Sequence, residues 1–170
     1  MKKSMIISVL FVSVMFIVPC AYSHCEIPCG IYGDEARFFI IEEHIDTIEK
    51  SMKMIAELSR DEDGDEEEGE ETNYNQLVRW INNKEYHADQ IQEIVSQYFM
   101  TQRVKPVDAE DEEACKMYME KITRLHKMLI SAMKAKQTTE LEHVKDLKSL
   151  LASFRGVYFG AEPGEHRQPK

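Results

Sequence analysis

Residues 37–55 read RFFIIEEHIDTIEKSMKMI, and this stretch decides the fold class. Its apolar side chains recur at alternating intervals of three and four residues, at Phe38, Ile41, Ile45, Ile48, Met52 and Ile55. That spacing is typical of one face of an α-helix. Because many of the intervening residues are charged, the stretch predicts an amphipathic helix with one buried side.

Three further apolar stripes with the same period follow along the chain, over residues 77–98, 114–132 and 141–154. No comparable alternation of apolar and polar residues, which would predict β-strands, occurs in the sequence. Amphipathic helices joined by short connections pack against one another through their apolar faces. The sequence therefore predicts an all-α protein, an antiparallel four-helix bundle over residues 34–155.

The residues between the apolar stripes predict where the helices begin and end. Residues 61–71, DEDGDEEEGEE, hold nine acidic residues and two glycines. Such a run repels itself and predicts a solvated linker between the first two helices. Pro106 ends the second helix, and Asp108 is predicted to cap the third. From residue 156 the chain is rich in Gly and Pro, which predicts a flexible tail over 156–170.

The first residues predict export. Two lysines precede an apolar run over residues 5–18, and Ala21-Tyr22-Ser23 places small residues where signal peptidase requires them. We expect residues 1–23 to be a signal peptide, with His24 as the first mature residue. The mature protein would then be periplasmic or extracellular, with no membrane span. An uncleaved anchor helix is the alternative for this segment.

The length and net charge of the chain limit the number of domains and the kinds of partner it can have. The chain has 170 residues, of which 43% are hydrophobic, which suits one domain with a folded core. Its formal net charge is −10. An acidic surface is repelled by phosphate backbones, so we expect no nucleic-acid partner.

Potential metal ligands gather directly after the predicted cleavage site, in the sequence HCEIPCGIYG at residues 24–33. After cleavage, His24 would offer its α-amine and imidazole, Cys25 its amide nitrogen and thiolate, and Cys29 its thiolate. Two nitrogens and two thiolates in one plane suit Ni(II) or Cu(II), whereas zinc prefers a tetrahedron. A Cys25–Cys29 disulfide is the other interpretation for an exported protein. The remaining mature cysteine, Cys115, lies in the third stripe and is predicted to be buried.

Residues 24–33 resemble the nickel hook of the nickel-dependent superoxide dismutase family. The family pattern is H-C-x-x-P-C-G-x-Y, and every fixed position is matched here. The predicted bundle also agrees with the fold of that family. The resemblance implies an enzyme that converts superoxide to O₂ and H₂O₂ by Ni(II)/Ni(III) cycling, with one nickel ion per subunit.

The resemblance also implies roles for individual residues. His24, Cys25 and Cys29 would bind the metal, and with Tyr32 they would form the catalytic set. Tyr32 would border the open axial face of the nickel. Tyr98, in the Gln-Tyr-Phe segment at residues 97–99, would be a second aromatic residue near the site. The family's assembly implies a homohexamer.

Two stretches depart from the pattern of the better-known members, which hold the axial imidazole through a Glu on the first helix and an Arg on the second. Here the corresponding residues are 38–41 (FFII) and 82–84 (NNK). An exported nickel- or copper-binding bundle without turnover is therefore the alternative function. A helical interaction protein closed by a disulfide is a third possibility. A di-iron bundle would need two Glu-x-x-His motifs, and only Glu140-x-x-His143 is present.

Overall fold

The computed structural model describes residues 33–59 and 70–160, with the side chains of residues 70–73 left aside. These residues form helices and no β-strand, which confirms the predicted all-α class. In chain order the elements are α2 (Asp34–Leu58), α3 (Glu70–Glu93), its continuation η2 (Ile94–Arg103), α4 (Glu112–Gln137) and α5 (Leu141–Phe159).

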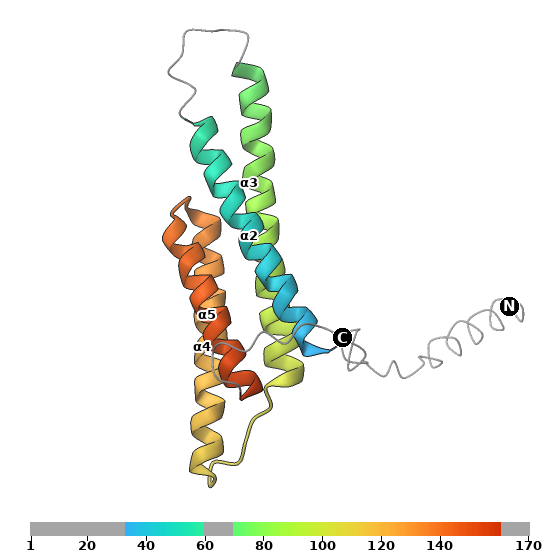
Figure 1. The fold of residues 1–170 in the computed structure, drawn as a ribbon, viewed down its shortest axis with the longest axis vertical. Coiled ribbons are helices and arrows are strands. Elements are labelled where there is room, and N and C mark those ends of the chain that lie inside the picture. Colours follow the sequence, from blue (N-terminus) through green and yellow to red (C-terminus); the bar gives the residue numbers. More distant parts are fainter. Residues whose placement is uncertain (1–32, 60–69, 161–170) are drawn as a thin grey trace, which may run out of the picture.

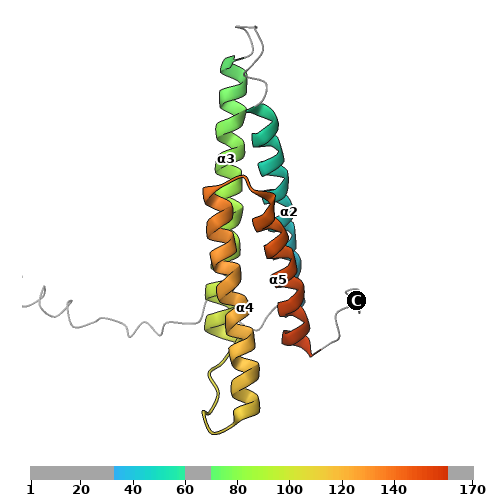
Figure 2. The ribbon, with the colours of Figure 1, turned by 90° about the vertical axis from the view of Figure 1, so that its left-hand side faces the viewer.

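The helices form two antiparallel hairpins that pack against each other as a four-helix bundle (Figures 1 and 2). Helix α2 contacts both α3 and α5, while α4 contacts α3, η2 and α5. The α2–α3 hairpin extends beyond the α4–α5 connection at one end (Figure 1). At the other end, the first turn of α2 lies near η2 and the last turn of α5. None of the described helices is long and apolar enough to cross a membrane.

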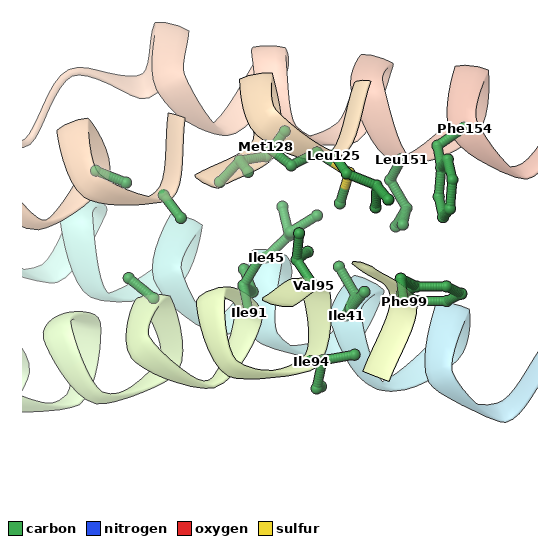
Figure 3. Packing of buried hydrophobic residues seen from close by; sticks show 14 of the residues in the cluster. Ile41, Ile45, Ile91, Ile94, Val95, Phe99, Leu125, Met128, Leu151 and Phe154 are labelled. Atoms are coloured by element: carbon green, nitrogen blue, oxygen red, sulfur yellow. The ribbon is translucent and has the colours of Figure 1, made fainter. Parts of the chain in front are cut away.

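The predicted apolar stripes supply most of the core. All six residues of the first stripe are buried. The core also contains Ile91, Val95, Leu125 and Leu147 from the other helices. Figure 3 shows the first three of these together with Ile41 and Ile45. Leu141 is an exception, because its side chain is 37% exposed at the start of α5. Near the protruding end of the α2–α3 hairpin, Leu77 is only half-buried, since α4 and α5 do not reach that far.

Two predicted boundaries need correction. Helix α3 begins at Glu70, so the last two residues of the predicted acidic linker are helical. Helix α5 continues to Phe159, four residues past the predicted limit, because Tyr158 packs on the aromatic core. It ends where Gly160 adopts a left-handed conformation with φ of 66°, which glycine reaches without a Cβ penalty. The predicted signal peptide lies outside the described residues.

The start of α4 also differs from the prediction. Asp111, not Asp108, caps this helix, and its carboxylate accepts a hydrogen bond from the amide of Ala114 at 2.9 Å. The Asp108 carboxylate instead accepts from the amide of Glu110 within the preceding turn. Cys115 lies in the first turn of α4 and is partly exposed rather than buried, because the bundle core begins further along the helix.

Candidate functional site

The structure fixes the point where the predicted hook joins the bundle. His24, Cys25, Cys29 and Tyr32 all lie outside the described residues. The description begins at Gly33, the residue after Tyr32. Gly33 is extended and its carbonyl accepts a hydrogen bond from the amide of Ala36, so α2 starts immediately behind the hook.

A polar cluster surrounds the first residue of α2. The carboxylate of Asp34 accepts hydrogen bonds from the Tyr98 hydroxyl at Oδ1 and, at 2.7 Å, from the Tyr158 hydroxyl at Oδ2. The Nε of Arg103 lies 2.8 Å from Oδ1 as an ion pair without the alignment of a hydrogen bond. The Nη2 of Arg103 donates to the Tyr98 hydroxyl at 2.8 Å. We call Asp34, Tyr98, Arg103 and Tyr158 the root cluster.

The winding of η2 explains why two members of the root cluster face the same way. Its backbone is π-helical, and the amide of Val104 bonds to the carbonyl of Phe99, five residues back. In such a helix, residues five apart lie on the same side. Arg103 therefore sits above the ring of Tyr98, with its guanidinium carbon 4.9 Å from the ring centroid.

The pKa shifts within the root cluster show which of its groups are protonated at neutral pH. Burial opposes the charge on Asp34, but the hydrogen bonds from Tyr98 and Tyr158 and the charge of Arg103 outweigh it and lower the carboxyl pKa. Burial and the bond to Asp34 raise the pKa of both phenols. At neutral pH Asp34 is therefore an anion, and both tyrosines hold their protons firmly.

Arginines collect around this end of the bundle. Arg37, one turn after Asp34, places its guanidinium carbon 4.9 Å from the centroid of the Tyr98 ring. Arg155 on α5 lies 5.2 Å from the ring centroid of Phe39. Together with Arg103, which pairs with Asp34, they place three arginines at the end of the bundle where α2 begins, in a chain whose net charge is −10.

A cluster of packed aromatic rings adjoins the root cluster. It is made by Phe38, Phe99, Phe154 and Tyr158. The rings of Phe38 and Phe99 are 5.0 Å apart, and those of Phe99 and Phe154 are also 5.0 Å apart. Figure 3 shows Phe99 and Phe154 facing each other at one end of the core. Edge-to-face and offset contacts at such distances pack tightly and exclude water.

The stretches that depart from the family pattern have structural roles here. Phe38 and Ile41 are buried in the core. Lys84 is 4% exposed, and its Nζ donates to the carbonyls of Ala135, Lys136 and Thr138 at 2.7–2.9 Å. It thereby satisfies the end of α4, where helix carbonyls lack intrahelical partners.

Other titratable groups in the bundle form pairs, not metal cages. The described residues contain no group of three or more His, Cys, Asp or Glu side chains that could hold a metal ion. His44 and His87 face each other with their Nδ1 atoms 2.7 Å apart. His143 lies beside Glu140, its partner in the single Glu-x-x-His motif, at 3.6 Å.

Sequence reasoning singled out Tyr98 but missed Asp34, Arg103 and Tyr158. Asp34 gave a weak signal, as an acid at the first position of a helix directly after the hook. Arg103 and Tyr158 gave none, because they meet Asp34 only through contacts that span 69 and 124 residues of sequence.

Comparison with known proteins decides the family. The model of the nickel-containing superoxide dismutase family matches residues 19–162, which include both the hook motif and the bundle. The chain belongs to this family. Membership in the nickel-containing superoxide dismutases makes it an enzyme that converts superoxide to O₂ and H₂O₂, with nickel as its cofactor. Neither the curated proteins nor the solved structures gave a significant match.

The chemistry of the available donors fits nickel. In nickel-containing superoxide dismutases the ion needs donors that stabilise its higher oxidation state, and thiolates and amide nitrogens do so. Residues 24–29 contain one His and two Cys within six positions. In the sequence they precede Gly33, the first described residue, and Asp34 of the root cluster follows it.

Proposed function

We propose that the dismutase site is the N-terminal hook, created when signal peptidase cuts after Ser23. His24 would hold nickel through its α-amine and imidazole, Cys25 through its amide nitrogen and thiolate, and Cys29 through its thiolate. The full match to the hook motif and a family match over residues 19–162, which includes the hook, support this proposal. Bound nickel would supply the one-electron redox couple that oxidises one superoxide and reduces the next.

The side chains near the hook would attract the superoxide anion and supply protons. Arg37 and Arg155 offset the acidic surface locally and attract a small anion, while Arg103 is paired with Asp34. The two protons taken up for each H₂O₂ come from water ordered by Tyr32 or from Tyr32 itself. Tyr98 and Tyr158 are poor donors, because their pKa values are raised by burial and by the hydrogen bond to Asp34.

Location and assembly follow from the same proposal. A chain processed by signal peptidase would lie in the periplasm or outside the cell, and the cut that removes the signal peptide would also create the metal-binding α-amine. We propose a homohexamer, as the family resemblance implies. Large apolar side chains such as Tyr86, Met117 and Met119 are exposed on the single subunit and offer surface for such contacts.

The family assignment favours turnover over the two alternatives, passive metal binding and a disulfide-closed interaction protein. The observation that carries the site itself is the uninterrupted H-C-x-x-P-C-G-x-Y motif behind a cleavage signal. It is tested by N-terminal sequencing, nickel content and a superoxide assay on the native protein. We expect His24 as the first residue and one nickel per subunit.

Cysteine variants sharpen this test. Cys25→Ser and Cys29→Ser should lose nickel and activity, while Cys115→Ser should keep both, because Cys115 lies in α4 and is not part of the hook motif. His24→Gln should retain nickel but lose most activity if the imidazole supports the redox cycle. A native chain that starts at any other residue, or a Cys25→Ser protein with a full nickel content, would exclude the hook.

A further inference from the structure

We propose that Asp34 is a positioning residue, whose carboxylate tethers the root of the nickel hook to η2 and to α5. This inference rests on the proposed hook, because a tether needs something to position. Asp34 is separated from Tyr32 by Gly33 alone. Any movement of its backbone is therefore passed directly to the end of the hook.

The start of α2 has no side-chain cap. Gly33 makes no side-chain capping bond, and helix ends fray unless their free amide groups or side chains find partners. The Asp111 carboxylate at the start of α4 is used as a cap. Asp34 instead directs its carboxylate across the bundle to two other elements.

Three contacts from two directions fix the position of this carboxylate. Tyr98 and Arg103 approach from η2, and Tyr158 approaches from the last turn of α5. Tyr158 is itself held by ring contacts of 5.4 Å with Phe154 and 5.5 Å with Phe99. The root of the hook is thus tied to the packed core and not only to its own helix.

The protonation states suit a tether rather than a proton relay. The Asp34 pKa is lowered and both phenol pKa values are raised, so each donor keeps its proton on the same bond across the neutral range. Hydrogen bonds to an ionised acceptor are the stronger kind. Residues that orient metal ligands from outside typically change metal affinity or activity by about 10–100-fold when they are removed.

The test compares Asp34→Asn with a variant that is destabilised elsewhere. Met52→Ala is the matched control, because Met52 is 1% exposed in the same helix but roughly 27 Å from Asp34 along its axis. Each full-length, processed protein is loaded with nickel. The measurements are thermal midpoint, the electron paramagnetic resonance signal of the oxidised metal, the rate of nickel release to EDTA, and activity.

For Asp34→Asn we expect nickel release roughly 10–100-fold faster than in the wild type, with an altered resonance signal. Met52→Ala should lower the thermal midpoint and leave signal and release rate unchanged. Tyr158→Phe removes a single hydroxyl and should shift release in the same direction by less. It keeps the test informative if Asp34→Asn folds poorly.

The tether is wrong if Asp34→Asn and Tyr158→Phe release nickel at the wild-type rate with an unchanged signal. It is also wrong if Met52→Ala changes both as much as they do. With either of these results, a wild type that still binds one nickel through Cys25 and Cys29 would support the hook, and only the tether would be wrong. If nickel binding survives the loss of those cysteines, both proposals fall together.

Discussion

Phe38 should contribute more to stability than almost any other side chain in α2. It is 1% exposed and its ring lies 5.0 Å from Phe99, 5.4 Å from Phe154 and 5.7 Å from Tyr158. Truncating a buried Phe to Ala typically costs about 3–5 kcal/mol. Aromatic pairs add about 0.5–1.5 kcal/mol beyond burial, so we expect Phe38→Ala to fall near the upper end, at about 4–5 kcal/mol.

A loss of that size would be a large part of the roughly 5–15 kcal/mol typical of a domain. It corresponds to a fall in thermal midpoint of roughly 8–20 °C for a chain of this size. The assay is urea unfolding of the nickel-free protein, followed by far-ultraviolet circular dichroism. Measurements at two protein concentrations separate loss of fold from loss of assembly.

The neighbouring residue provides the control. Phe39 directly follows Phe38 in α2 but is 37% exposed, so Phe39→Ala should cost less than about 1 kcal/mol. Equal losses for the two variants would refute the packing of α2 described here. So would a Phe38→Ala protein within about 1 kcal/mol of the wild type.

Two further predictions concern polar groups between the helices. Lys84→Met should lower the free energy of unfolding by roughly 2–3 kcal/mol in urea titrations, because three carbonyls at the end of α4 lose a charged donor. As the control, Lys53→Met removes an exposed lysine and should change the free energy of unfolding by less than about 1 kcal/mol. Equal losses for the two variants would contradict the role of Lys84 at the end of α4. Burial lowers the pKa of both His44 and His87 below the ordinary 6.5, so the unfolded chain binds more protons and stability falls as the pH drops below that value. Thermal midpoints at about pH 7.5 and about pH 5.5 should therefore differ less for His87→Gln than for the wild type, and an unchanged difference would count against the histidine pair.

Much of the fold could be predicted because the residues that build it repeat with a local period. The spacing of Phe38, Ile41 and Ile45 defines a helix face without reference to any other part of the chain. Boundaries were less accurate where a distant contact decides them. Helix α5 reaches Phe159 because Tyr158 finds partners on α2 and η2, and no local signal announces this.

The candidate site divides in the same way. The hook ligands lie within six positions of one another, so their chemistry can be predicted from residues 24–33 alone. Their surroundings are not. The corresponding stretches of the better-known members suggested that support was missing at residues 38–41 and 82–84. In the structure Phe38 and Ile41 serve the core, and Lys84 serves the end of α4.

The sequence by itself determined the helical class, the apolar faces and the hook motif, since each depends on neighbours within a few residues. Only the tertiary structure decided what stands beside the start of the first helix. Asp34, Arg103 and Tyr158 meet because η2 winds with a π-helical period and α5 runs back to the same end of the bundle. Such a meeting depends on how whole helices pack, and no local pattern encodes it.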